Sequence, residues 1–409
     1  PVGRREVLAS AHERKRRDGV TIIWITHFME EVTGADRVFV MDAGKIALTG
    51  RPEEVFAREA ELKKLGLELP PVTRLAYDLK EAGFVLPDVV LSRQQLTDAL
   101  WQHRRPEDAG ANQNKDHKCG DTEDILLQAQ KVSYLYGANS PYQTQALHEV
   151  DFAIRRGSFH ALIGPTGSGK STLVQILGGL EKPTAGQVLF DGDDIYAQTY
   201  SRKAMRGRLG LLFQYPEYQL FETSVLTDVC FGPKNMGLSP EEAKERAIAA
   251  LQLVGIPEDK YDNSPFDLSG GQKRRAAIAG ILAMEPDVLV LDEPTAGLDP
   301  EGRDGILESI KKMREERGMT VILVSHSMED VARYVDRAVV IRRGEVLYDD
   351  VPREVFQHIK ELEEIGLSAP RVTYLMHELK TRGLDVDVHA TTVEEAKESI
   401  LKLLKKKSK

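Results

Sequence analysis

The sequence contains few cysteines and lacks long apolar segments. Cys119 and Cys230 are the only cysteines among 409 residues, and Cys119 lies in a polar stretch, so we do not expect a disulfide framework. Residues 276–284 form one of the longest apolar runs, and they fall short of the roughly 20 residues that cross a bilayer. No secretory leader follows Pro1. These absences favour a protein of the reducing cytosol that reaches a membrane only through partners.

An excess of positive charge is missing as well. The 55 lysines and arginines are outnumbered by 64 aspartates and glutamates, giving a formal net charge of -9. Such a balance provides no general attraction to nucleic-acid phosphates. The sequence also has no CxxC zinc pair and no strongly basic extension. We therefore expect no nucleic-acid partner.

What the sequence does contain is an internal repeat. Residues 21–29 (TIIWITHFM) match residues 320–328 (TVILVSHSM), and carrying the alignment backward places Pro1 on Pro300. After a one-residue insertion in the second copy the identities continue: Asp36 with Asp336, Pro52 with Pro352 and Thr73 with Thr373. The first copy thus starts just after the position equivalent to Asp299. We interpret residues 1–103 as the C-terminal remnant of a first domain.

Three further segments follow this remnant. Residues 104–123 are polar with almost no large apolar side chains, which is typical of an interdomain linker. Residues 124–345 form the complete unit, and residues 346–409 contain helix-length segments of a smaller C-terminal domain. Within the complete unit, short branched apolar runs at 160–163, 288–291 and 321–324 alternate with helical patterns. This alternation predicts an α/β fold around a parallel sheet.

The first motif in the complete unit that indicates a chemical function is a glycine-rich loop. The sequence GPTGSGKS from Gly164 to Ser171 follows a strand pattern and precedes a helix with one apolar face, the context of a phosphate-binding loop. Glycines let backbone N–H groups surround phosphates, Lys170 would meet the β and γ oxygens, and Ser171 would ligate Mg²⁺. The alternative is an ordinary glycine-rich turn without a ligand, in which the lysine occurs by chance. The residues predicted to bind nucleotide here are Gly164, Pro165, Thr166, Gly167, Ser168, Gly169, Lys170, Ser171 and Thr172.

Two other motifs suit the same chemistry. The apolar run VLVL ends in Asp292, a predicted Mg²⁺ ligand, and Glu293, a candidate general base, although such a pair alone is often a strand meeting solvent. The sequence LSGGQ precedes an Ala-rich helix and would present backbone N–H groups at a helix N-terminus, or would simply be a turn with an N-cap. Its predicted nucleotide contacts are Ser269, Gly270, Gly271 and Gln272.

Taken together, GPTGSGKS, LSGGQ, LVLDEP and Ser325-His326 resemble the ATP-binding cassette (ABC) ATPases over residues 124–344. The resemblance implies a P-loop NTPase fold with a RecA-like core, an antiparallel β subdomain and an α-helical subdomain. It also implies site residues beyond the loop. Gln214 would sense the metal as a ligand and couple to a membrane subunit, His326 would contact the γ-phosphate, Asp299 would belong to the interface loop, and Tyr136 would stack on adenine, with Tyr134 as a nearby alternative. His27 aligns with His326 and would be its counterpart in the first cassette.

Residues 213–221 (FQYPEYQLF) and 228–233 (DVCFGP) resemble a narrower family, the energy-coupling factor transporter ATPases, which import vitamins or cobalt and nickel ions. That resemblance implies a peripheral protein on the cytoplasmic face of the cell membrane. Its partners would be a second ABC ATPase domain, as a heterodimer or intramolecular pair, a transmembrane coupling subunit and a substrate-binding membrane subunit. Residues 346–409 would be a helical dimerisation domain.

The resemblance implies ATP and Mg²⁺ as ligands and hydrolysis as the reaction. Glu293 would activate an in-line water, while Lys170, Mg²⁺ and His326 would stabilise charge on the transferring phosphoryl group. One rival is a soluble cassette ATPase of translation or DNA repair, but no heptad arm interrupts the cassette. A second rival is a regulator that binds ATP without turnover. The intact Glu293 and His326 argue against it.

Overall fold

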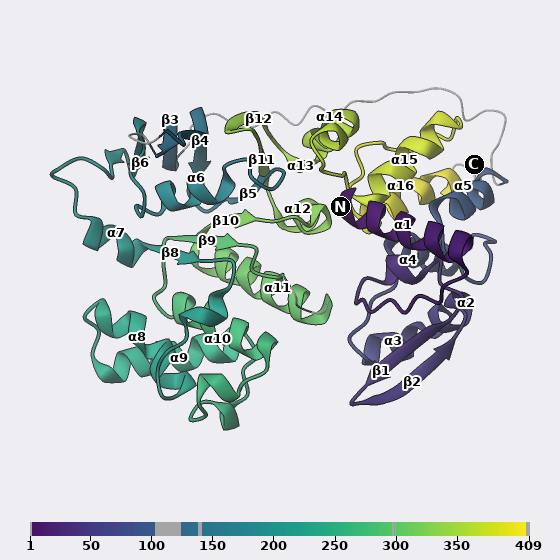
Figure 1. The fold of residues 1–409 in the computed structure, drawn as a ribbon, viewed down its shortest axis with the longest axis horizontal. Helices are drawn as coiled ribbons and strands as arrows, with labels where there is room; N and C mark the ends of the chain where they lie inside the picture. The colour runs from purple at the N-terminus through teal and green to yellow at the C-terminus, as the bar shows by residue number, and fades with distance from the viewer. Residues whose placement is uncertain (1, 103–123, 138–140, 297, 299, 406–409) are drawn as a thin grey trace. The chain divides into compact units, whose positions relative to one another are not determined.

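A computed structural model describes residues 2–102, 124–137, 141–296, 298 and 300–405 (Figure 1). The predicted linker and Asp299 lie outside these residues. The described chain divides into two compact units. The first is built from residues up to 102, residues 300–301 and residues from 356 onward, and the second from residues 124–298 and 302–355. Within the described residues, no helix is long and apolar enough to cross a membrane.

A six-stranded sheet forms the centre of the second unit, with the strand order β12-β11-β5-β10-β9-β8. Five of its strands run parallel and β12 is antiparallel to β11. Strands β5, β9 and β10 are buried along their whole length, as apolar strands covered on both faces must be. The sheet includes residues 346–350, so it extends past the predicted domain boundary at 345. Its strands are β5 (Phe159–Ile163), β8 (Leu209–Leu212), β9 (Val288–Asp292), β10 (Thr320–Val324), β11 (Arg337–Arg342) and β12 (Glu345–Asp350).

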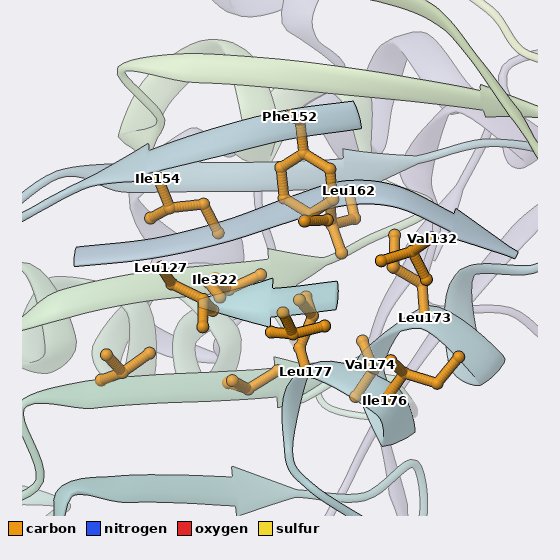
Figure 2. Close-up of a cluster of buried hydrophobic side chains, with 14 of the residues drawn as sticks. Leu127, Val132, Phe152, Ile154, Leu162, Leu173, Val174, Ile176, Leu177 and Ile322 are labelled. Carbon is orange, nitrogen blue, oxygen red and sulfur yellow. The ribbon is translucent and has the colours of Figure 1, made fainter. Parts of the chain in front are cut away.

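A four-stranded antiparallel sheet with the order β4-β3-β6-β7 packs against this core. Its strands are β3 (Ile125–Tyr136), β4 (Thr144–Arg155), β6 (Ala185–Phe190) and β7 (Asp193–Asp194). Figure 2 shows where the two sheets meet helix α6 (Lys170–Leu177): Phe152 and Leu127 from the antiparallel sheet, Leu162 and Ile322 from the parallel sheet and Leu177 from the helix form one apolar cluster. Each such side chain stabilises the fold by about 1.5–3 kcal/mol when buried. The cluster therefore holds α6 firmly against the end of β5.

Helices make up the remainder of the second unit. Serine side chains cap α8, α9 and α10 at Ser224, Ser239 and Ser269, each accepting a hydrogen bond from a backbone N–H of the first turn, which fixes where each helix begins. The predicted fold class, a P-loop NTPase with an antiparallel β subdomain and a helical subdomain, is confirmed. These elements are α7 (Arg202–Arg208), η2 (Pro216–Gln219), α8 (Val225–Asn235), α9 (Pro240–Leu253), η3 (Glu258–Lys260), η4 (Pro265–Asp267), α10 (Gly270–Leu282), α11 (Pro300–Arg317), α12 (Met328–Tyr334) and α13 (Pro352–Val355).

The first unit combines the two repeat copies in one core. Apolar side chains of α4 and α5 pack with those of α15 and α16, and these helices lie side by side (Figure 1). Leu75 and Leu79 of the first copy and Leu375 and Leu379 of the second are all fully buried there. The elements of this unit are α1 (Val2–Asp18), η1 (Met29–Val32), β1 (Val38–Asp42), β2 (Lys45–Gly50), α2 (Pro52–Phe56), α3 (Glu59–Lys64), α4 (Pro71–Glu81), α5 (Arg93–Trp101), α14 (Ile359–Glu364), α15 (Arg371–Thr381) and α16 (Val393–Lys405).

The sequence repeat is also a structural repeat. Strands β1 and β2 pair antiparallel from Val38 opposite Gly50, and β11 and β12 pair in the same register from Ala338 opposite Asp350. Both hairpins carry an irregularity at the same place, after Val40 in one and Val340 in the other. The aligned threonines also match. Thr73 donates to the carbonyl of Val90 at 2.6 Å and Thr373 to that of Ala390 at 3.2 Å.

The copies differ most at the segment that aligns with β10. In the second copy β10 lies between β5 and β9, and Ile322 is fully buried. In the first copy residues 21–26 pair with no strand in the described part of the chain, and Ile23 and Ile25 are 87% and 95% exposed. The same apolar pattern is therefore a core strand in one copy and an exposed segment in the other.

Candidate nucleotide-binding site

The phosphate-binding loop joins the end of β5 to the start of α6. Gly169 is the N-cap of α6 with φ +105°, and Gly167 has φ +78°, a backbone region that L side chains rarely adopt. A Cβ at Gly169 would lie 2.6 Å from the carbonyl oxygen of Ala146, and one at Gly164 would lie 2.3 Å from that of Ile341. Glycine is thus required at both ends of the loop by conformation or by close packing.

Lys170 is held over this loop. Its Nζ donates to the carbonyl oxygens of Gly164 at 2.8 Å and Pro165 at 2.9 Å. Burial lowers the pKa of the Lys170 ammonium, and the nearby Glu293 and Asp292 carboxylates oppose that shift. The loop therefore places a buried cation beside the N-terminus of α6, where the backbone N–H groups also favour an anion.

The acidic pair lies at the carboxyl end of β9. Ser171 Oγ donates to Asp292 Oδ2 at 3.4 Å, which brings the end of β9 against the first turn of α6. Burial, and then the charge of Glu293, raise the pKa of the Asp292 carboxyl. Glu293 itself adopts φ +51°, and its backbone N–H donates to the carbonyl of Val324 at 3.0 Å. A non-glycine residue in this region stores about 1–3 kcal/mol of strain, a feature often found at functional sites.

Three parallel strands deliver the remaining predicted catalytic side chains. His326 Nε2 lies 3.0 Å from Glu293 Oε1, and Gln214 Nε2 donates to Glu293 Oε2 at 3.5 Å. Gln214, Glu293 and His326 follow the neighbouring strands β8, β9 and β10, so their convergence arises because carboxyl ends of parallel strands share one sheet edge. The hydrogen bond from His326, the largest cause, lowers the pKa of the Glu293 carboxyl against the opposing effect of burial.

The donors near the loop fit a magnesium ion. Ser171 offers a hydroxyl, Asp292 a carboxylate and Gln214 an amide, and hard oxygen donors of this kind are what Mg²⁺ prefers. The described residues include no cluster of three or more histidine, cysteine or acidic side chains able to hold a metal. In a nucleotide complex, phosphate oxygens and waters would complete the coordination of such an ion.

The two candidate adenine-stacking tyrosines have different surroundings. Tyr134 donates to Glu181 Oε2 at 2.9 Å, packs against the core, and has its pKa raised to about 12 by that hydrogen bond. Tyr136 is 43% exposed, and its hydroxyl lies 3.1 Å from Thr172 Oγ1 on α6. Its ring therefore stands beside the helix that begins at the phosphate loop, and this position favours Tyr136 over Tyr134 as a stacking surface.

The signature residues form the N-terminus of α10. Ser269 Oγ accepts from the backbone N–H of Gln272 at 3.3 Å, and Gln272 Oε1 accepts from the Ser269 N–H at 3.0 Å. No atom outside the local chain lies within 4 Å of a Cβ built at Gly270, so that face of the helix start is open. Among the described residues, no hydrogen bond or ion pair joins this motif to the phosphate loop of the same cassette. Ser269 therefore caps α10, and the N-terminus of this helix is exposed.

Sequence reasoning missed one buried charge in this region. Arg274, in the second turn of α10, is 5% exposed, and its Nη2 lies 3.4 Å from the carbonyl oxygen of Gln214 and 3.5 Å from Glu217 Oε2. Arg274 is the middle residue of a basic triplet (Lys273, Arg274 and Arg275) that directly precedes the small and apolar run from Ala276. The neighbouring Lys273 is part-exposed, so positive charge alone does not distinguish the buried residue from the exposed one.

This fold and this arrangement of the phosphate loop, acidic pair, glutamine and histidine define an ABC-type ATPase, and residues 147–296 match the family model described as ABC transporter. The chain is 51% identical over 279 residues to the energy-coupling factor transporter ATP-binding protein EcfA2 of Caldanaerobacter subterraneus subsp. tengcongensis, a match covering 68% of this chain and 98% of that protein. It is 49% identical over 285 residues to the EcfA2 of Clostridium tetani, covering 69% of this chain and 99% of that one.

A solved structure of cbiO1 from Clostridium perfringens, described as part of the ABC transporter complex cbiONQ, superposes with a TM-score of 0.53. It is 40% identical and covers 62% of this chain and 100% of its own. The chain belongs to the family of energy-coupling factor transporter ATP-binding proteins. It binds ATP, and its activity is ATP hydrolysis coupled to transport.

Proposed function

We propose that the complete cassette hydrolyses ATP at the junction of the phosphate loop and the ends of β8, β9 and β10. The observation that carries this is the convergence of Gln214 and His326 on the Glu293 carboxylate. Because its pKa is lowered, Glu293 is an ionised base at neutral pH and can take a proton from an attacking water. Lys170 and the N–H groups at the start of α6 hold the phosphates, and His326 orients Glu293 and faces the transferring phosphoryl group.

Mg²⁺ belongs to this proposal as a ligand of the nucleotide. Ser171, Asp292 and Gln214 would hold it, and when bound it would neutralise charge on the β and γ phosphates. Burial penalises the charged form of the Asp292 carboxylate, and a nearby cation would stabilise that form. Tyr136 supplies the aromatic face for adenine.

The signature motif of a second cassette completes the site. Within the part of the chain that the structure describes, no hydrogen bond or ion pair joins the open helix N-terminus at Ser269 to its own phosphate loop, and its exposure supports pairing with another cassette. A solved dimeric ATP-binding cassette, MJ0796, bound to ADP and phosphate, is 31% identical and superposes with a TM-score of 0.52. We propose that the C-terminal domains of the two copies pair within the chain, because α4 and α5 of the first copy share a core with α15 and α16 of the second. That core already occupies the apolar face of both C-terminal domains within one chain. Residues 1–103 contain no signature motif, so a complete cassette must supply it.

The cassette pair would drive uptake of a vitamin or a transition-metal ion from the cytoplasmic face of the membrane. The names of the relatives support this role, and so does an exposed aromatic surface next to Gln214. Tyr215, Tyr218 and Phe221 are 56%, 85% and 58% exposed, and an apolar surface of this kind suits a membrane subunit. A transmembrane coupling subunit and a substrate-binding membrane subunit would be the partners. The relatives do not favour a soluble cassette ATPase of translation or DNA repair.

The first experiment is a Mg²⁺-ATPase assay of the 409-residue chain, alone and with a complete cassette supplied in trans, with Lys170→Ala as the blank. We expect activity above the blank that rises when the added cassette supplies the second signature. Activity equal to that of Lys170→Ala under both conditions would contradict the proposal. Purification in mild detergent tests the transport role, which would be contradicted if no membrane subunit accompanies the chain.

A further inference from the structure

Arg274 is a buried cation that the catalytic residues do not explain. It lies on the second turn of α10, and only 5% of its surface is exposed. One guanidinium nitrogen, Nη2, faces two oxygens of the segment after β8: the carbonyl oxygen of Gln214 at 3.4 Å and Glu217 Oε2 at 3.5 Å. The helix that begins with the signature motif is therefore connected directly to the residue that contacts the general base.

The contacts form a short path through the second unit. Ser269 caps α10, Arg274 follows five positions later on the same helix, and Gln214 extends its side chain to Glu293 Oε2 at 3.5 Å. A helix moves as a rigid element, so a displacement at its N-terminus moves Arg274 with it. Because the guanidinium touches the backbone of Gln214 rather than its amide, such a movement shifts the whole residue.

The geometry of this ion pair differs from that of a purely structural one. Buried arginine and carboxylate groups that serve stability are usually joined by short, bidentate hydrogen bonds. Here both contacts are long, and Arg274 Nε and Glu217 Oε2 are buried without a hydrogen-bond partner in the structure. Small movements of α10 can therefore shorten these contacts and improve the pairing of both groups.

We propose that Arg274 is a positioning residue that sets the place of Gln214, and through it Glu293, according to the position of α10. Engagement of the signature motif by a partner cassette moves α10, and Arg274 carries that movement to the glutamine. The inference rests on the proposed pairing of cassettes and adds the residue that connects the signature of this cassette to its own general base.

The test is a double-mutant cycle in the full chain with a complete cassette in trans. We expect Arg274→Gln to lower kcat about five- to tenfold while the KM for ATP stays within about twofold. In a Gln214→Ala background the same substitution should change kcat by less than about twofold, because its effect acts through Gln214. Arg274→Lys should restore part of kcat, since it keeps the charge near Glu217. Lys273→Gln, one position earlier, is the matched control and should leave kcat unchanged.

Two outcomes would overturn the proposal. One is an equal loss of kcat from Arg274→Gln in both backgrounds, which means that Arg274 acts independently of Gln214. The other is a change in KM alone. If Arg274→Gln fails to fold, Glu217→Gln, which is more exposed, replaces it in the same cycle. A failure of the pairing itself is recognised separately, as wild-type turnover that does not respond to the added cassette.

Discussion

His326 Nε2 lies 3.0 Å from Glu293 Oε1, and this contact joins the carboxyl ends of two adjacent parallel strands. The contact lowers the pKa of the Glu293 carboxyl and holds the carboxylate beside the loop lysine. The aligned histidine of the first copy, His27, lies instead beside Phe28, with ring centroids 4.1 Å apart. The histidine thus acquires its carboxylate partner only where the complete sheet surrounds it.

Replacing Glu293 by glutamine should remove the base and leave the fold intact. We expect ATP binding within about twofold of the wild type and a loss of turnover of about 10²–10⁴-fold, the range for a positioned acid–base group. Single-turnover hydrolysis and equilibrium nucleotide binding measure the two effects separately. Glu241→Gln, an exposed change of the same kind on α9, is the control. Near-normal turnover in Glu293→Gln would refute the assignment.

Substitutions of Tyr134 and Tyr136 should have different effects on ATP affinity in a nucleotide-binding assay. Because Tyr136 stands exposed beside α6, we expect Tyr136→Leu to weaken ATP binding about tenfold, whereas Tyr136→Trp should retain most of the affinity. Tyr134→Phe removes only the hydrogen bond to Glu181 and should change the affinity little. A larger loss from Tyr134→Phe than from Tyr136→Leu would transfer the stacking role to Tyr134.

Gly169 offers a test of the loop geometry. A Cβ there would meet the carbonyl oxygen of Ala146 at 2.6 Å in addition to the unfavourable φ of +105°, so Gly169→Ala should abolish ATP binding. Gly192 has φ +85° with nothing within 4 Å of a built Cβ. Gly192→Ala should therefore cost about 1 kcal/mol of stability and leave binding intact. Isothermal titration with ATP and thermal unfolding distinguish the two, and wild-type affinity in Gly169→Ala would contradict the loop geometry.

Ile23 and Ile322 occupy aligned positions with opposite surroundings. Ile322→Ala removes a fully buried side chain from the central sheet and should lower the free energy of unfolding by about 2–5 kcal/mol. The Ile23 side chain is 87% exposed, so Ile23→Ala should change the free energy of unfolding by less than about 0.5 kcal/mol. Urea unfolding of both variants measures the difference. Equal losses would mean that residues 21–26 are buried in solution.

His160, on β5, should make stability depend on pH. Burial lowers the pKa of this imidazole to about 4, from 6.5 in the unfolded chain. Between these values the unfolded state binds the extra proton, so the free energy of unfolding rises with pH from about 4 to 6.5, by about 3 kcal/mol at most. His160→Asn should flatten this part of the pH profile in urea unfolding relative to the exposed His148→Asn. An unchanged slope would contradict the burial of a neutral imidazole.

The motifs predicted the chemistry of this chain because each is local. Local structure explains the spacing from Gly164 to Ser171, because these residues join a strand to a helix N-terminus through a loop that needs positive φ. The α/β class followed from branched apolar runs in the same way and is confirmed. Arg274 could not be assigned a function from its motif, because its partners Gln214 and Glu217 are some 60 positions away in sequence and meet it only through the packing of η2 on α10.

The repeat shows where the sequence by itself was sufficient and where it was not. Residues 38–50 form the same hairpin register as residues 338–350, because pairing between neighbouring strands depends on the local sequence and its turn. Residues 21–26 share the apolar pattern of β10 but are exposed, because a buried parallel strand needs neighbours that are distant in sequence. Sequence alone determined the motifs, the repeat and the fold class. The tertiary structure decided which carboxylate His326 meets, which tyrosine stands beside the loop and which copy buries its strand, since each depends on contacts between segments far apart in the chain.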